Sequence, residues 1–241
     1  MKRSLPFLII LALAIAGAAA GTAIYRSKKA EIAAAAAPVL PAGTTGEPGA
    51  KPPHVQGPAQ GATVVLEEFG DFQCPPCGGL AVFLRELEQE HASKLAVIFR
   101  QFPLPLHKFA MKAADASEAA AAQGRFWEMH RLIYDNQSTW STSGDAGPLF
   151  ESYAKQIGLD LDRYRADIEA PGLHDRVLAD QSRGRSLGVT GTPAVFINDE
   201  RVPPASLNEG ALRHAVEVAI KGKKPIFDSA NETKSTPSPS P

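Results

Sequence analysis

Apolar positions follow two different spacings between about residues 62 and 104. The run ATVVLEEF, residues 62–69, is apolar at most positions and predicts a buried strand. The next segment, LAVFLRELEQEHAS, places leucine and phenylalanine at helical spacing over residues 80–93. KLAVIFRQFPL, residues 94–104, predicts a second strand that stops at its proline. This order of strand, helix and strand is typical of a unit that builds a parallel strand pair.

A helical pattern then continues through about residues 106–187. After it, VTGTPAVFIND, residues 189–199, predicts a short apolar strand followed by a turn. NEGALRHAVEVAIKG, residues 208–222, predicts a closing helix. Strands on both sides of a helical insertion indicate one α/β domain, residues 62–222, interrupted by a helical subdomain.

The two ends of the chain lack the periodicity of this domain. Residues 1–29, MKRSLPFLIILALAIAGAAAGTAIYRSKK, form an apolar stretch with basic residues on both flanks and predict an uncleaved signal anchor. A cleaved signal peptide is the alternative, because small residues follow the apolar stretch. Residues 30–61 are rich in Ala, Pro and Gly and predict a tether, and residues 223–241 predict a disordered Ser/Pro tail.

Composition and charge narrow the classes of function. The chain has 25 basic and 26 acidic residues, without a long run of either sign. Such a balance argues against a nucleic-acid-binding surface or a strongly acidic substrate. The export-type N-terminus instead suggests that the domain works outside the cytoplasm.

Cys74 and Cys77 are the only cysteines, and they are separated by two prolines. A structural disulfide across so short a loop would remove little chain entropy. A zinc site needs four ligands, and neither a second cysteine pair nor a matching histidine spacing is present. Copper handling would favour clustered methionines, whereas the three methionines are dispersed. A redox pair is therefore the favoured interpretation, and no metal is expected.

The position of the cysteines before the predicted helix supplies a mechanism. If the helix begins at the motif, Cys74 is its N-cap, Pro75 and Pro76 are its first two residues, and Cys77 is the third. A sulfur at the N-cap can accept the N–H of Cys77 and lies at the positive end of the helix dipole. Both effects lower the thiol pKa, so we expect Cys74 to be the exposed, activated thiol and Cys77 to be sheltered.

Three segments together resemble one family. VVLEEFGDFQCPPC, FWEMHRLIYDNQ and GVTGTPAVFIN are similar to segments of the DsbA-like thiol:disulfide oxidoreductases over about residues 62–222. The resemblance implies an α/β, thioredoxin-like fold with an inserted all-helical subdomain. It also implies that Pro193 is cis and faces the sulfurs, whereas a trans proline opening a strand is the alternative. By position, Gly191 and Thr192 would then pair with an extended substrate peptide, beside Pro75 and Pro76.

The family also tends to place an acid six residues before the first cysteine, which is Glu68 in this sequence. Strand alternation predicts that Glu67 and Glu68 face opposite sides, one buried and the other solvated. A buried Glu68 would have a raised pKa and would relay a proton to or from Cys77, whereas a charge at a strand edge is the alternative. His107 and His130 are expected to be structural.

The sequence departs from the best-known family members at one position. They often carry histidine before the second cysteine, and this chain has Pro76, which lacks both the imidazole and the N–H. The resemblance therefore leaves open whether the pair donates disulfides or serves a membrane-tethered reductase or isomerase arm. A non-catalytic, peptide-binding chaperone-like module is a further alternative.

We expect an enzyme, a thiol:disulfide oxidoreductase that donates the Cys74–Cys77 disulfide to reduced, unfolded secreted proteins. It would need no cofactor. The expected partners are these substrates and a membrane redox protein that reoxidises the pair. The expected location is the inner membrane, with the catalytic domain facing the periplasm or another extracytoplasmic space.

Overall fold

The computed structural model describes residues 48–58 and 61–227. The predicted anchor, most of the predicted tether and the end of the predicted tail lie outside these residues. Within the described residues, no helix combines the length and apolar character that a bilayer crossing requires.

A five-stranded mixed sheet forms the centre of the domain, in the order β1, β3, β2, β4, β5. The strands are β1 (His54–Gln56), β2 (Val64–Gly70), β3 (Leu95–Gln101), β4 (Ala194–Ile197) and β5 (Glu200–Arg201). As expected for the strand, helix, strand unit, β2 and β3 are parallel, whereas the other pairs are antiparallel. Leu66 of β2 faces Val97 of β3 and Ile197 of β4, so apolar runs from distant parts of the chain meet in the middle of the sheet.

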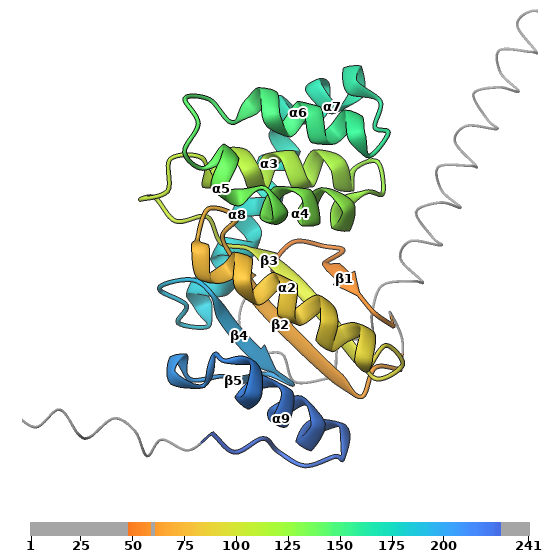
Figure 1. The fold of residues 1–241 in the computed structure, drawn as a ribbon, viewed down its shortest axis with the longest axis vertical. Coiled ribbons are helices and arrows are strands. Elements are labelled where there is room, and N and C mark those ends of the chain that lie inside the picture. Colours follow the sequence, from red (N-terminus) through yellow and green to blue (C-terminus); the bar gives the residue numbers. More distant parts are fainter. Residues whose placement is uncertain (1–47, 59–60, 228–241) are drawn as a thin grey trace, which may run out of the picture. The chain divides into compact units, whose positions relative to one another are not determined.

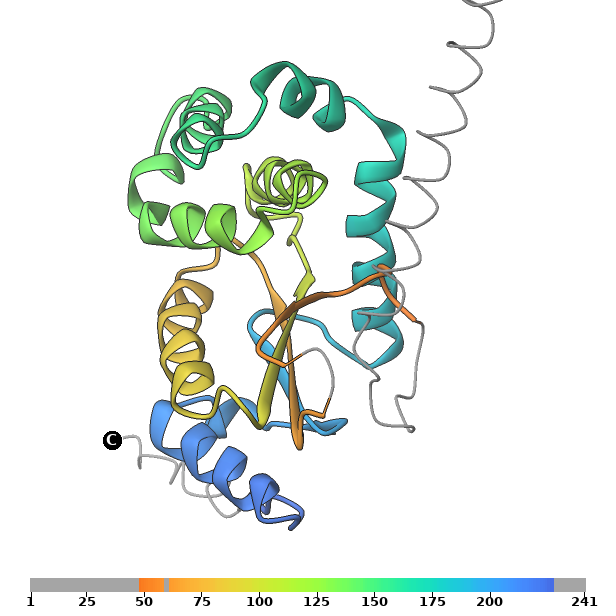
Figure 2. The same ribbon diagram turned by 90° about the vertical axis from the view of Figure 1, so that its right-hand side faces the viewer.

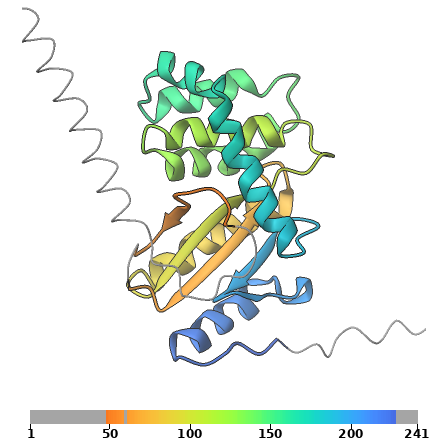
Figure 3. The same ribbon diagram turned by 180° about the vertical axis from the view of Figure 1, so that it is seen from behind.

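Helices cover both faces of this sheet, as the side view in Figure 2 shows. On one face lie α2 (Pro75–Glu90) and α9 (Glu209–Ile220), with a core that includes Leu84, Leu87 and Val216. On the other face lies α8 (Pro171–Ser186), which crosses in front of the strands in Figure 3, where the domain is seen from behind. Because the sheet is covered on both sides, its central strands are buried along almost their whole length rather than at alternate positions.

The helical insertion packs at one end of the sheet, beyond the start of α2 (Figure 1). It contains α3 (Ala110–Ala121), α4 (Phe126–Asp135), α5 (Gln137–Trp140), α6 (Gly147–Gln156), α7 (Leu161–Ile168) and the first part of α8. A short 3-10 helix, η1 (Pro204–Ser206), precedes α9. The predicted insertion, about residues 106–187, agrees with these bounds. A second core, which includes Phe99, Met129 and Trp140, joins the insertion to the sheet.

Helix α8 approaches the sheet closely at Gly184. A Cβ atom at this position would lie 2.6 Å from a ring carbon of Phe102 and 3.0 Å from one of Phe69. Glycine is therefore required by packing at this crossing, rather than by backbone conformation.

The predicted tether is wrong for residues 48–58. Strand β1 pairs with β3 antiparallel, and Ala50 is buried. The backbone N–H of Ala50 donates to Asp180 Oδ1 at 2.8 Å, and its carbonyl accepts from Arg100 at 2.9 Å. The segment lacks apolar periodicity because distant side chains hold it through backbone groups. The predicted tail also begins too early, since Phe227 packs against the core under α9.

Glu67 also differs from the expectation, because both glutamates of β2 are buried. Glu67 does face the side opposite Glu68, but there it accepts from Arg100 Nε at 2.8 Å and from both Nε and Nη2 of Arg183, at 2.8 and 2.7 Å. Although burial opposes it, the two guanidinium groups hold the pKa of Glu67 below its ordinary value. The pairing connects β2, β3 and α8.

Candidate active site

Cys74 is the N-cap of α2, with extended backbone angles of φ −75° and ψ 117°. Pro75 and Pro76 open the helix and are exposed, and Cys77 is the third helical residue, as predicted. One detail of the prediction is wrong: the sulfur of Cys74 accepts no capping hydrogen bond. The Cys77 N–H donates instead to the carbonyl oxygen of Cys74, at 3.1 Å.

The two thiols are both free, so the structure represents the reduced protein. Cys74 is 6% exposed and Cys77 is fully buried. The expected order of accessibility is therefore confirmed, but Cys74 is less open than predicted. The loop that carries Thr192 lies against it, and in its protonated form Cys74 Sγ donates to the carbonyl oxygen of Thr192 at 3.3 Å.

The environment separates the two thiols electrostatically. A hydrogen bond from the Cys77 thiol is the largest cause that lowers the pKa of Cys74 to about 6. Thr192 and the Cys77 amide also lower this pKa, whereas burial and the Asp71 carboxylate oppose them. Burial raises the pKa of Cys77 well above its ordinary value, and the nearby Cys74 and Glu68 add to the shift. Cys74 is therefore the thiolate at neutral pH.

The loop before β4 completes the site. The Thr192–Pro193 peptide bond is cis, as the family resemblance implies. Gly191, Thr192 and Pro193 are each half-buried, and the Thr192 hydroxyl oxygen is buried without a hydrogen-bond partner in the described part of the chain. The structure therefore brings the loop and Cys74 together, although 118 positions separate Cys74 from Thr192.

Glu68 lies on β2 under the start of α2, and it is 2% exposed. Burial raises the pKa of its carboxyl group to about 8, and the negative charge of Cys74 adds to this shift. Its Oε1 atom has no hydrogen-bond partner among residues 48–58 and 61–227. The expectation of a buried carboxyl group near the cysteine pair is met, and a strand-edge position is excluded.

Three polar residues that we did not predict from the sequence hold the active-site loop. Buried Asp71 accepts the backbone N–H groups of Gln73 and Leu104, at 2.7 and 2.8 Å. From the insertion, the side-chain amide of Gln137 donates to the carbonyl oxygens of Phe72 and Cys74. The side chain of Gln73 accepts from the N–H of Phe109. All three lie in segments that carry the family resemblance, but no pattern in the sequence indicated their roles.

The two histidines occupy the places of supporting residues. His107 Nδ1 lies 2.7 Å from Asp71 Oδ2. His130 is buried, and burial lowers its pKa to about 3, so the imidazole is neutral. Within the described ranges, no group of three or more His, Cys, Asp or Glu side chains is arranged to hold a metal ion.

Solved structures share this fold. A thioredoxin-like oxidoreductase from Silicibacter pomeroyi DSS-3 is 26% identical, with a TM-score of 0.60 over 70% of this chain and 92% of that chain. BdbD from Bacillus subtilis is 20% identical, with a TM-score of 0.64 over 74% of this chain and 98% of that chain. The catalytic domain of Proteus mirabilis ScsC is 21% identical, with a TM-score of 0.54 over 66% and 85%.

Curated relatives carry a different name. A protein named Na(+)/H(+) antiporter NhaA 1 from Salinispora arenicola is 37% identical over 172 residues, which are 71% of this chain and 25% of that protein. A protein named Na(+)/H(+) antiporter NhaA from Herminiimonas arsenicoxydans is 32% identical over 149 residues, or 62% and 23%. The chain thus spans about a quarter of the length of these relatives.

A family model agrees with the solved structures over most of the domain. The model of the Thioredoxin_4 family, described as thioredoxin, matches residues 50–217, which include β1, the cysteine pair, the insertion and the cis-Pro193 loop. The chain belongs to the Thioredoxin_4 family, and its thioredoxin fold with a helical insertion is that of the DsbA-like thiol:disulfide oxidoreductases.

Proposed function

We propose that this protein is an extracytoplasmic thiol:disulfide oxidoreductase that donates the Cys74–Cys77 disulfide to reduced exported proteins. The observation that carries the proposal is a thiol with a pKa of about 6 at a helix N-terminus, against the cis-Pro193 loop. A stabilised Cys74 thiolate favours the reduced enzyme, and by linkage this makes the disulfide a better oxidant.

The exchange proceeds in two displacements. A substrate thiolate attacks Cys74 Sγ, the Cys74–Cys77 bond breaks, and Cys77 leaves as a thiolate that takes a proton. The second substrate thiolate then attacks the substrate sulfur of the mixed disulfide and releases Cys74 as a thiolate. The substrate is oxidised by two electrons and the cysteine pair is reduced by two.

Glu68 is the proton donor for Cys77 in this scheme. Its carboxyl group is protonated up to about pH 8, so it carries a proton at neutral pH. During reoxidation Cys77 must lose its proton again, and Glu68 then acts as the base. The electrostatic coupling of Glu68 with both cysteines supports this role.

The cis-Pro193 loop is the substrate-binding element of the proposal. The backbone of Gly191 and Thr192 lies beside Cys74 and would pair with an extended peptide by strand addition. Pro75 and Pro76, which directly follow Cys74, are exposed and provide apolar surface next to it. Such a site reads backbone rather than sequence, which suits many unfolded substrates.

The location and the redox partner are part of the proposal. The apolar segment of residues 1–29 supports export and anchoring in the inner membrane, with the catalytic domain on the extracytoplasmic side. A membrane redox protein would accept the two electrons from the reduced pair.

The curated relatives favour a second candidate. They are named Na(+)/H(+) antiporters, and this chain matches about a quarter of their length. In this second candidate, the same thiol exchange is directed at a membrane antiporter rather than at soluble exported proteins. The chemistry at Cys74 is unchanged in this candidate, and the partner differs.

Oxidative refolding of a reduced, disulfide-containing protein tests the proposal. The oxidised full chain should accelerate refolding, and Cys74→Ser should abolish the acceleration. Cys77→Ser should accumulate mixed disulfides in cells, because the buried resolving thiol is missing, and the captured proteins distinguish exported substrates from an antiporter. Catalysis of disulfide reduction without any oxidation would overturn the proposal in favour of a reductase or isomerase arm.

A further inference from the structure

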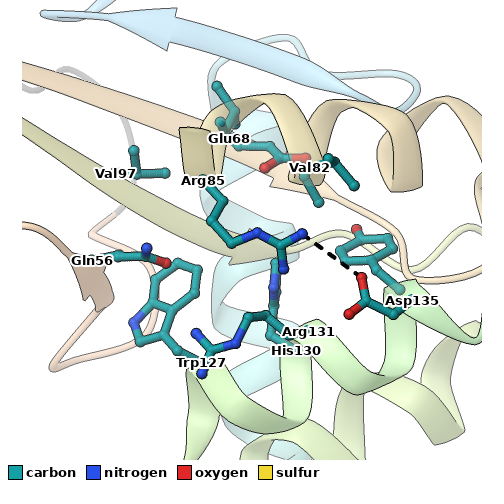
Figure 4. Close-up of a pocket in the computed structure, with 12 residues that line it drawn as sticks. Gln56, Glu68, Val82, Arg85, Val97, Trp127, His130, Arg131 and Asp135 are labelled. Atoms are coloured by element: carbon teal, nitrogen blue, oxygen red, sulfur yellow. Dashed lines mark ion pairs between the residues drawn. The ribbon is translucent and has the colours of Figure 1, made fainter. Parts of the chain in front are cut away.

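A small cavity lies between α2, α4 and the sheet, and Glu68 lines it. Its volume is about 20 Å³. Figure 4 shows Glu68 on β2, Arg85 reaching from α2, and His130 and Asp135 on α4 around this space. The cavity therefore lies between the buried carboxyl group of the active site and the partly exposed side chains of Arg85 and Asp135.

Three unsatisfied polar atoms line this one cavity. Glu68 Oε1, His130 Nε2 and the Tyr134 hydroxyl are buried and have no hydrogen-bond partner among the residues that the structure describes. The three residues are 2%, 6% and 6% exposed. Buried polar atoms in folded proteins are nearly always hydrogen-bonded, to protein or to ordered water. Three such atoms around one space indicate a shared partner.

Water fits that space in size and in chemistry. A cavity of about 20 Å³ exceeds the roughly 10–15 Å³ that one water molecule requires. A buried water makes about three hydrogen bonds, and the three atoms offer that number. Val97, Leu84 and Ala81 form apolar walls of the space, and its other polar lining residues include Gln56, Trp127 and Arg131.

The mouth of the cavity is closed only loosely. Arg85 Nη2 lies 3.9 Å from Asp135 Oδ1, and the two side chains are 28% and 49% exposed. Such an exposed pair at the limit of ion-pair distance holds weakly. On α4, His130 and Tyr134 are four positions apart and share one helix face, and Asp135 at the end of the same helix lines the space beside them.

The groups along this route suit proton exchange. Burial and nearby positive charges keep His130 neutral, with a pKa of about 3, and burial keeps Tyr134 protonated. Neither group binds the proton itself, and both can orient a water. Glu68 needs such a route because it is almost fully buried and must change protonation state in every redox cycle.

We propose that a water molecule bound by Glu68, His130 and Tyr134 transfers the Glu68 proton to and from solvent past the Arg85–Asp135 pair. This inference rests on the proposed function. After Glu68 protonates the leaving Cys77 thiolate, the bound water gives Glu68 a proton and receives one from solvent. During reoxidation the proton moves outward by the same path, so charge and atoms balance at each step. His130 and Tyr134 are positioning residues.

Several titratable groups face Glu68 and contribute to any pH profile. They are Cys74 and Cys77 on α2, and His130 and Tyr134 on α4, with Arg85 at the mouth. On the neighbouring strands, the residues opposite Glu68 are Phe99 and Val195, which do not titrate.

Tyr134→Phe in the full-length chain tests the route, because it removes one hydroxyl. Tyr164→Phe is the matched control, since Tyr164 is also buried and its hydroxyl also has no partner in the described part of the chain, but it lies outside the cavity. We expect Tyr134→Phe to slow disulfide exchange about ten-fold below pH 8 and to increase its solvent deuterium isotope effect. The alkylation rate of Cys74 should stay unchanged in both variants.

A double variant separates the route from a packing effect. If Tyr134 acts through Glu68, Tyr134→Phe should slow exchange no further when combined with Glu68→Gln. The proposal is overturned if Tyr134→Phe slows exchange equally in the wild type and in Glu68→Gln. It is also overturned if Tyr134→Phe and Tyr164→Phe exchange disulfides at the same rate. In both cases, the proposed function is unaffected as long as the wild type exchanges disulfides.

A crystal structure of the reduced full chain gives a test that depends on no variant. It should show an ordered water within hydrogen-bond distance of Glu68, His130 and Tyr134. A dry cavity would overturn the inference even if the enzyme is active. If the water is present but the wild type does not exchange disulfides, the proposed function is wrong. The water would then have no role in catalysis.

Discussion

At the scale of single residues, Cys74 and Cys77 differ in every property that decides reactivity. Cys74 lies at the helix N-terminus with a pKa of about 6, and Cys77, one turn further, is fully buried with a raised pKa. The hydrogen bond between the thiols links the two shifts, because Cys77 remains protonated in order to donate to Cys74. One sulfur is therefore attacked and the other resolves.

The lowered pKa of Cys74 predicts how stability depends on redox state. A thiol whose folded pKa is depressed stabilises the reduced protein above its unfolded pKa of about 9 and loses this effect as pH falls through 6. The oxidised form has no such group. Guanidinium melts should therefore show the reduced form to be the more stable at pH 8, by a margin that shrinks towards pH 5. Pro76→His should increase this difference in stability between the reduced and oxidised forms. If the oxidised form is the more stable one, the prediction is wrong.

Glu68 predicts a pH dependence of the opposite sign. Its folded pKa of about 8 exceeds the ordinary 4.5, so its contribution is most favourable below pH 4.5 and is lost as pH rises towards 8. Glu68→Gln should therefore become more stable than wild type across this window, by up to about 1.4 kcal/mol per pH unit. Urea melts at pH 5 and pH 8 measure the change. A constant difference between the two proteins would show that Glu68 does not titrate there.

At the scale of elements, α8 joins the sheet to the helical insertion. Arg183 and Asp180 of α8 pair with Glu67 and Arg100 of the neighbouring strands, and Gly184 allows the close approach. Partnered buried charges of this kind are costly to separate, so they define the position of α8. Since the insertion also supplies Gln137 to the active-site loop, its placement bears on the cysteines.

Two glycines of α8 give a matched pair of substitutions. Gly184→Ala places a methyl group against the Phe102 and Phe69 rings, and it should lower the free energy of unfolding by about 1–3 kcal/mol. Gly172→Ala meets no atom within 4 Å and should leave stability unchanged or raise it by up to about 1 kcal/mol. Thermal or urea unfolding compares them. Equal effects would show that α8 does not pack tightly on the sheet.

At the scale of the whole domain, residues 48–58 close one side of the fold. The carbonyl oxygens of Lys51 and Pro52 accept from Arg176, and that of Val55 accepts from the Trp127 indole. His54 stacks on Phe126 and lies 2.7 Å from Glu118. The segment therefore contacts both the insertion and strand β3, and its own strand β1 forms one edge of the sheet.

Removal of this segment tests its contribution. A chain that begins at Gly61 loses β1 and removes one buried partner each from Arg100, Asp180 and Glu118, so we expect a loss of more than about 3 kcal/mol in stability. A chain that begins at Pro48 keeps these contacts and should match the full chain. Urea melts of both proteins decide the point, and equal stability would mean that β1 is dispensable.

Much of the fold could be predicted because its signals are local. Strands β2, β3 and β4 are apolar runs, α2 and α9 follow helical spacing, and the cysteine pair lies between a strand and a helix. The N-cap geometry of Cys74 follows from the two prolines after it. Membership of a family with a cis-proline loop was indicated by three short segments, and the structure agrees at Pro193.

Tertiary structure decided the features whose partners are far away in the chain. Strand β1 is held through backbone groups by Arg100 and Asp180, so its own side chains carry no pattern. Glu67 is buried because Arg183, 116 positions later, neutralises it. The cavity beside Glu68 exists because α4 packs there. The sequence by itself thus determined the elements and the reactive cysteine pair, through short-range periodicity and capping, whereas long-range packing decided which charges are buried and what surrounds them.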